Sequence, residues 1–213
     1  MWQRFATEYR RCVRCKVDGL LDPKAFPILM KDPPKSTEVL FILEAPNRDD
    51  TCNLNKRHLT VGPETDPSGR FFHDLFINEL QFPIENLFVT NSVLCLPVKK
   101  NGKYPVTSMQ QFNCKAMLQR MIEEFNPLIV CPMGTKALIA TARLDNHGFK
   151  NMVTSVAKPT SWYGRTLFPL YHTSGQARNP RNGRPEIKQR SDWRCLRAVW
   201  ERLKEQCYRH EKK

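Results

Sequence analysis

Short apolar segments alternate with amphipathic helical segments along this chain, and that alternation limits the possible fold more than any other feature. Four apolar runs have the length and the β-branched or aromatic content of strands: residues 39–43, 87–90, 128–130 and 166–171. Four segments with helical spacing lie between or after them: residues 69–80, 107–125, 134–142 and 191–208. The pattern predicts an α/β fold, a three-layer α/β/α sandwich with a central, mostly parallel four-stranded sheet.

Two of these segments carry more detailed predictions. The run 166–171 contains Pro169, so we expect it to be an edge strand or an irregular one. The helix expected over 107–125 begins at a Thr/Ser cap and places four apolar side chains on one face: Phe112, Met117, Met121 and Ile122. The helix expected over 191–208 begins with Ser191 as a cap.

Charge points to a polyanionic partner. The chain has 213 residues, and 34 Lys and Arg against 21 Asp and Glu give a formal net charge of +13. A phosphate backbone would relieve the resulting self-repulsion, although a merely basic protein without such a partner has the same composition. Apolar residues make up 40%, which is typical of a globular protein. We expect one domain over 1–213, no membrane span, no secretory signal, a cytoplasmic location and a monomer.

Cysteine content suggests a metal site or free core thiols rather than disulfides. The eight cysteines are Cys12, Cys15, Cys52, Cys95, Cys114, Cys131, Cys195 and Cys207. Cys12 and Cys15 form a CxxC pair, and 18 residues separate Cys95 from Cys114. A zinc ribbon normally has two CxxC pairs, so this spacing favours an iron–sulfur cluster, with zinc and core thiols as alternatives. Cys52 is the main alternative ligand.

Polar residues follow the predicted strands at their carboxyl ends, where open parallel sheets bind ligands. Glu44, Ala45 and Asn47 follow the first strand, with Asp49 and Asp50 close behind. Asn91 ends the second strand, Gly134 follows the third, and His172 with Ser174 follows the fourth. Each of these alone is typical of a turn or a structural histidine, but together they predict one crevice.

Five segments in chain order then carry a resemblance: residues 12–15 (CVRC), 43–47 (LEAPN), 90–97 (TNSVLCLP), 114–118 (CKAML) and 172–178 (HTSGQAR). They resemble motifs of the uracil-DNA glycosylase superfamily, specifically its iron–sulfur, family 4-like branch. Within that branch the chain resembles a divergent member, because it departs from the family's motifs at several positions. Leu43 and Asn47 replace two motif glycines, and Thr173 replaces a proline. The family's uracil-stacking aromatic segment aligns with residues 63–66, which hold no aromatic residue.

The resemblance implies a 4Fe–4S cluster with a structural role, held by Cys12, Cys15, Cys95 and Cys114. It also implies roles in base recognition. Asn91 would read the uracil edge, His172 would donate to uracil O2, and Ala45 and Asn47 would line the base site. Asp50 would position water or stabilise the sugar cation, and Glu44 would hold the loop or the water. A loop-stabilising role is the alternative for both carboxylates, and Phe71 or Phe72 could replace the missing ring or belong to the core.

Basic residues and one serine around these motifs are the predicted DNA contacts. They are Ser174, Arg178 and Arg181 in the loop after His172, together with Lys99 and Lys100 between the distal cysteines. Arg184, Lys188 and Arg190 follow in the same basic region. The covalent uracil-trapping branch of this superfamily carries a basic motif with a reactive histidine between the second motif and the last cysteine. Residues 97–105 occupy that region and contain no histidine. The resemblance therefore implies no covalent capture.

Together these features predict a monofunctional DNA glycosylase that flips out uracil and hydrolyses its N-glycosidic bond, which starts base excision repair. Uracil-containing DNA, single- or double-stranded, is the expected partner. Two alternatives stay open. One is a glycosylase for another deaminated base, hypoxanthine or xanthine; the other is a non-catalytic sensor of uracil or damaged DNA.

Overall fold

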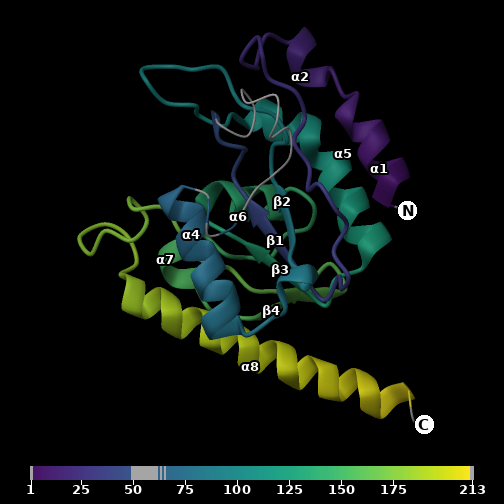
Figure 1. Cartoon of the computed structure of the whole chain (residues 1–213), viewed down its shortest axis with the longest axis vertical. Coiled ribbons are helices and arrows are strands. Elements are labelled where there is room, and N and C mark those ends of the chain that lie inside the picture. Colours follow the sequence, from purple (N-terminus) through teal and green to yellow (C-terminus); the bar gives the residue numbers. More distant parts are fainter. Residues whose placement is uncertain (1, 49–61, 63, 65, 212–213) are drawn as a thin grey trace.

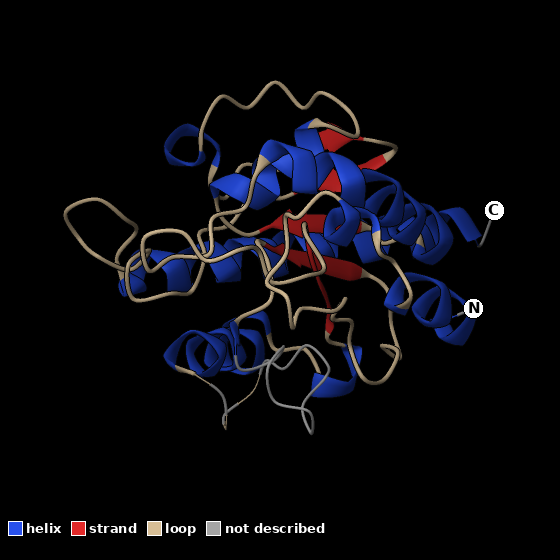
Figure 2. Ribbon diagram, turned by 90° about the horizontal axis from the view of Figure 1, so that it is seen from above, coloured by secondary structure: helices blue, strands red, loops and turns tan. Residues whose placement is uncertain are grey.

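A twisted central sheet with helices on both faces forms the core of the molecule (Figures 1 and 2). The computed structural model describes residues 2–48, 62, 64 and 66–211. In this part of the chain the strands are β1 (Val39–Leu43), β2 (Phe88–Asn91), β3 (Ile129–Pro132), β4 (Thr160–Trp162) and β5 (Arg165–Leu167). Their order is β2-β1-β3-β5-β4, and every neighbouring pair is parallel except β4–β5. The predicted mostly parallel α/β architecture is confirmed.

The predicted number of strands is wrong, because the sheet has five strands and the additional one is β4. Only three residues long, β4 lacks the apolar run that marks the others. Tyr163 and Gly164 connect β4 to β5 with φ values of 49° and 69°, the positive pair that a tight hairpin turn requires. The last predicted strand was expected to be an edge strand or an irregular one. It is not at the edge, because β5 pairs on both sides, but it is irregular: β5 ends at Leu167, and the rest of the run continues past Pro169 with an isolated bridge between Leu170 and Met133.

The helices complete the outer layers. They are α1 (Trp2–Arg10), α2 (Arg14–Val17), α4 (Pro67–Asp74), α5 (Ser108–Phe125), α6 (Thr135–Ala142), α7 (Met152–Ser155) and α8 (Glu186–Glu211), with a π-helical turn η1 (Leu75–Leu80) and a 3₁₀ turn η2 (Ile84–Asn86). The last helix begins at Glu186 rather than at Ser191. No helix in the described ranges combines the length and apolar composition needed to cross a membrane.

Alternate residues of β1 enter two separate apolar clusters, which shows why this strand is apolar throughout. Leu40 and Ile42 pack in the cluster that includes Phe5 of α1 and apolar residues of α5 and α6. Phe41 packs in the other cluster, where its ring lies 5.2 Å from that of Trp193 of α8 and 5.3 Å from that of Phe72 of α4. The sheet is therefore covered on both faces.

One face of α5 differs from the prediction. Met117, Met121 and Ile122 are buried as expected, but Phe112 is 65% exposed. Two glutamines, Gln110 and Gln111, are buried instead. Both make side-chain hydrogen bonds to backbone carbonyls of other segments, and these bonds set the rotation of the helix.

Candidate active site

The carboxyl ends of the parallel strands bring several predicted site residues to one edge of the sheet. Asn91 ends β2 and pairs in register with Leu43, directly before Glu44. Glu44, His172 and Ser174 line one cavity of about 480 Å³, together with residues of the first turn of α6. The structure therefore joins two predicted catalytic residues in one cavity, from segments 128 positions apart in the sequence.

Asn91 is the most unusual polar residue at this edge. Its side chain is completely buried, and neither its amide nitrogen nor its oxygen has a hydrogen-bond partner among the described residues. Leaving buried polar groups unpaired costs about 1–3 kcal/mol each, so native proteins rarely do so without a reason. Asn91 is not among the described residues that line the Glu44–His172 cavity. It belongs to the same sheet edge, because its register partner Leu43 directly precedes Glu44.

His172 has a defined protonation state. Its Nδ1 accepts a hydrogen bond of 3.1 Å from the backbone N–H of Ser174, so the ring proton of the neutral form lies on Nε2. Burial lowers the pKa of His172, and the nearby negative charge of Asp66 opposes this shift only in part. The side chain is therefore a neutral Nε2–H donor at pH 7.

Glu44 connects two loops through its backbone, and its side chain lines the cavity. Its carbonyl oxygen accepts hydrogen bonds from the Ser92 hydroxyl (2.7 Å) and the Val93 N–H (3.2 Å), which join the loop after β1 to the loop after β2. Burial raises the pKa of the Glu44 carboxyl, while the positive charge of Lys136 acts in the opposite direction. The loop contacts do not involve the carboxylate, so both roles considered for it from the sequence stay predictions.

Lys136 is a cavity residue that sequence reasoning missed. It lies in the first turn of α6, lines the cavity with Glu44 and His172, and donates a 3.0 Å hydrogen bond to the Val106 carbonyl. A signal for it was present, because Lys136 comes two residues after Gly134 at the carboxyl end of β3. Gly134 itself has φ of +87°, a backbone conformation that favours glycine, and its position lies in van der Waals range of the His172 side chain.

The segment expected to hold the stacking aromatic provides a carboxylate instead. Asp66 caps α4 by accepting a 2.7 Å hydrogen bond from the Gly69 N–H, and the exposed Asn47 donates to it at 3.5 Å. The charge of Asp66 also reaches His172. Ala45 is half-buried in the loop after β1. Asp50 and Cys52 lie outside the described residues.

Neither candidate for the replacement ring presents a free face. Phe72 is buried between Phe41 and Trp193. Phe71 is also buried, and the guanidinium groups of Arg178 and Arg190 lie 4.7 and 5.5 Å from its ring centre. Both rings belong to the packing of α4.

The decisive comparison concerns the chain as a whole. A family model described as the uracil DNA glycosylase superfamily matches residues 30–204. The chain belongs to this superfamily. The matched region includes Glu44, Asn91 and His172, whereas the cysteine pair of residues 12 and 15 precedes it. Membership supports a DNA glycosylase, a hydrolase of base excision repair that acts on DNA.

In this uracil DNA glycosylase superfamily member, two basic loops project on the same side of the molecule (Figure 1). One is a tight turn in which the backbone groups of Lys100 and Lys103 exchange hydrogen bonds of 2.8 and 3.0 Å, which leaves Lys99 and Lys100 exposed. The other follows His172 and contains Arg178 and the exposed Arg181. Such loops can reach phosphates on both sides of the site.

Several arginines of the second loop and α8 are engaged within the protein. Arg178 pairs with Glu186 at 3.5 Å in addition to covering Phe71. Arg184 makes a two-pronged ion pair with the buried Asp192. Arg190 bridges acidic residues of α4, η1 and α8. Arg184 and Arg190 therefore fix the loop and helix, and the exposed Arg181 is better placed to meet DNA.

The four predicted cluster cysteines gather at a second cavity, of about 290 Å³. Cys12 and Cys15 come from α2 and the turn before it, Cys95 from the loop after β2, and Cys114 from α5. The Asn113 amide donates to the Cys15 sulfur at 3.4 Å. A hydrogen bond from Cys114 is the main cause that lowers the pKa of Cys15 to about 7, while burial raises the pKa of Cys95 to about 12.

The four thiols around this cavity are the kind and number of donors that a 4Fe–4S cluster uses, one for each iron atom. Within the described residues, no group of three or more His, Cys, Asp or Glu side chains that could hold a metal ion is present. The cluster therefore stays a prediction from the sequence. The buried Cys131 packs in the core.

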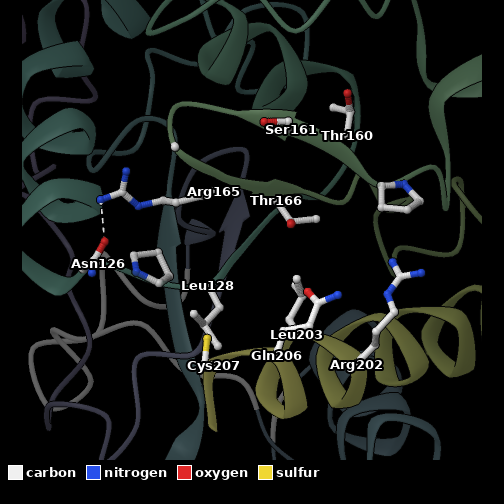
Figure 3. Close-up of a pocket in the computed structure, with 13 residues that line it drawn as sticks. Asn126, Leu128, Thr160, Ser161, Arg165, Thr166, Arg202, Leu203, Gln206 and Cys207 are labelled. Carbon is white, nitrogen blue, oxygen red and sulfur yellow. Dashed lines mark hydrogen bonds between the residues drawn. The ribbon is translucent and has the colours of Figure 1, made fainter. Parts of the chain in front are cut away.

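A larger cavity, of about 970 Å³, lies away from this site (Figure 3). It separates the β4–β5 hairpin from the C-terminal half of α8, and Arg165, Arg202 and Gln206 are among its lining residues. Asn126 and Leu128, at the amino end of β3, also line it. It is therefore at the opposite end of the strands from the residues that carry the predicted chemistry.

Proposed function

We propose that this protein is a monofunctional DNA glycosylase that flips uracil out of DNA and hydrolyses its N-glycosidic bond. The orphaned amide of Asn91 is the observation that supports uracil. A fixed Asn can donate to uracil O4 and accept from N3–H, and its two polar atoms would then gain the partners they lack. Cytosine presents the reverse pattern of donor and acceptor, so it would leave both unpaired.

His172 would stabilise the departing base. Cleavage leaves negative charge on uracil, and a neutral Nε2–H donates a hydrogen bond to O2 that strengthens as this charge develops. The Ser174 N–H holds the tautomer that can donate. By analogy with oxyanion holes, one such donor contributes about 10²–10³ in rate.

Carboxylates would act on the sugar side. The sugar becomes cationic as the bond breaks, and an ionised Glu44 in the cavity favours that charge or orients the attacking water. Burial raises the pKa of Glu44, and the positive charge of Lys136 would favour the ionised form against that effect. Asp50, which follows Glu44 in the sequence after the first predicted strand, is proposed to share this role.

The iron–sulfur branch is part of the proposal, with a 4Fe–4S cluster on Cys12, Cys15, Cys95 and Cys114. When bound, the cluster would supply a covalent cross-link rather than chemistry. It would join α2 to the loop after β2 and to α5, and the lysine turn of residues 99–103 extends from that same loop. Contact of DNA with Lys99, Lys100, Ser174, Arg178 and Arg181 is proposed on the same basis. The monomeric state and cytoplasmic location are expectations from the sequence alone.

A panel of labelled oligonucleotides tests this function. Each would carry uracil, hypoxanthine, xanthine or a normal base, single- or double-stranded, and would be treated with alkali after incubation with protein purified anaerobically. The proposal predicts scission at uracil only. Scission at hypoxanthine or xanthine instead would support the alternative function, a glycosylase for another deaminated base. Retarded migration of uracil DNA without abasic sites would indicate a sensor.

A further inference from the structure

The first turns of α5 expose two large apolar side chains, Met109 and Phe112. Their exposed fractions are 54% and 65%. The sequence pattern places Phe112 in the core, so its exposure needs a physical cause.

Buried glutamines supply that cause. Gln110 donates to the Leu20 carbonyl at 2.7 Å and accepts from the Thr107 N–H at 2.8 Å. Gln111 donates to the Lys136 carbonyl at 2.7 Å. With 3.6 residues per turn, Met109 and Phe112 then lie about 60° apart, on the side opposite the two glutamines. The apolar pair is held outward by hydrogen bonds on the inner face.

The same contacts join this turn of α5 to the candidate active site, while the apolar pair lies on the opposite face of the helix. Lys136 accepts from Gln111 through its backbone and donates through its ammonium to Val106, which precedes the cap residue of α5. Lys136 also lines the cavity that contains Glu44 and His172. The exposed ring of Phe112 is thus carried by the turn of α5 that is bonded to the cavity wall.

Basic residues neighbour the pair along the chain, and one more contacts the backbone of the residue after Phe112. The lysine turn of residues 99–103 leads into α5, and Lys115 follows Phe112 by three residues. Arg14 donates to the Asn113 carbonyl at 3.4 Å. One acidic group, Asp18, accepts from the Asn113 side chain at 2.9 Å. The balance of charge favours a polyanion over an acidic or apolar protein surface.

We propose that Met109 and Phe112 form a stacking surface for an unpaired base of the bound DNA strand, which favours single-stranded DNA. The choice of DNA as occupant rests on the proposed function. Proteins that bind single strands combine a basic groove with exposed aromatic side chains on which bases stack. Bases within a duplex stack on one another, so they have no free face to offer Phe112.

The test is fluorescence anisotropy with the full-length protein and a labelled, uracil-free 20-mer, as single strand and as duplex. Variants are Phe112→Ser, Phe112→Trp and, as a matched exposed apolar control at the amino end of β2, Ile84→Ser. We expect Phe112→Ser to weaken single-strand binding about fivefold or more. Duplex binding should change less than twofold. Phe112→Trp should bind at least as tightly as the wild type, and Ile84→Ser should bind like it.

Salt dependence separates stacking from charge. Phe112→Ser should leave the slope of log K against log salt unchanged, whereas Lys100→Ala should reduce it by about 0.7 for a single strand. Equal single-strand affinity in Phe112→Ser and wild type would overturn the proposal, as would an equal loss on both DNA forms. A dimer that Phe112→Ser converts to monomer, with DNA affinity unchanged, would assign this face to self-association instead.

Because the DNA contains no uracil, the result does not depend on turnover. A protein that shows the predicted binding pattern but excises no base would keep this inference and lose the proposed function. The opposite result is also possible: the protein excises uracil, and its Phe112→Ser variant binds single strands as tightly as the wild type. That result would support the proposed function and overturn this inference.

Discussion

The backbone N–H of Ser174 donates a 3.1 Å hydrogen bond to Nδ1 of His172. This contact assigns the ring proton to Nε2, and burial lowers the pKa of the imidazole so that the neutral form persists. A neutral donor suits a site that must accept negative charge on a leaving base without first giving up a proton.

Asp66 should influence the pKa of His172. Its negative charge raises the pKa of His172 against the larger effect of burial, so Asp66→Asn should lower that pKa further. The neutral form would then persist to lower pH, and the acidic limb of kcat/KM should move to lower pH. A pH–rate profile of both proteins checks this, with Glu64→Gln as a matched control in the same segment. An upward move of the limb would contradict the assignment.

Lys136 should lower the pKa of Glu44, whereas Asp66 raises the pKa of His172. Burial raises the pKa of Glu44 and Lys136 counteracts it, so Lys136→Met should raise that pKa. If the ionised carboxylate is the active form, the acidic limb of kcat/KM moves to higher pH. Lys136→Arg should restore the wild-type profile because it retains the charge. A carbon-13 NMR titration of Glu44 that gives the same pKa in Lys136→Met and wild type would refute the coupling.

The unpaired side-chain amide of Asn91 should lower the stability of the protein without bound DNA. Replacing its orphaned amide with the similarly sized Leu removes two unpaired polar atoms, so Asn91→Leu should raise the free energy of unfolding by about 1–3 kcal/mol. Uracil excision should fall by about 10² or more because the base edge loses its reader. Urea unfolding and single-turnover kinetics measure the two effects.

Thr90 offers a control in the same strand. Its hydroxyl also lacks a partner among the described residues, so Thr90→Val should stabilise the protein while excision continues. If Asn91→Leu were less stable than the wild type, the Asn91 amide would have hydrogen-bond partners in solution, which would contradict the prediction for Asn91.

The cysteine cavity should bind iron. Protein purified anaerobically should contain about four irons per chain, and Cys95→Ser should lose most of them along with thermal stability. Cys195→Ser, at an exposed cysteine of α8, is the control and should retain the iron. Elemental analysis measures both metals: zinc in place of iron would exclude the cluster, and full iron content in Cys95→Ser would exclude Cys95 as a ligand.

The main architecture could be predicted from the sequence because β1, β2 and β3 are continuous apolar runs between amphipathic helices. β4 could not, since three residues that include two hydroxyl side chains carry no strand pattern until β5 pairs with them. Phe112 was assigned to the core by its spacing alone. The rotation of α5 depends instead on hydrogen bonds from Gln110 and Gln111 to residues distant in the sequence.

The candidate site could likewise be predicted only in part. Position after a strand was enough to predict that Glu44, Asn91 and His172 lie at one edge of the sheet, because the carboxyl ends of parallel strands share one edge. Lys136 and Asp66 were missed because their roles depend on which helix begins beside His172, and only tertiary packing decides that. Arg184 and Arg190 matched the composition of a DNA-binding loop, but their carboxylate partners lie in segments that the sequence does not connect to them.

Release of free base, measured by mass spectrometry under single-turnover conditions, tests the central claim most directly. Uracil-containing single-stranded DNA would be incubated with wild type, Asn91→Ala, His172→Ala and the Ile84→Ser control. The account predicts uracil from wild type and Ile84→Ser, with rates lower by about 10²–10³ in His172→Ala and by at least about 10² in Asn91→Ala. Uracil release that neither substitution slows would contradict it, and so would a folded, iron-containing wild type that releases no uracil.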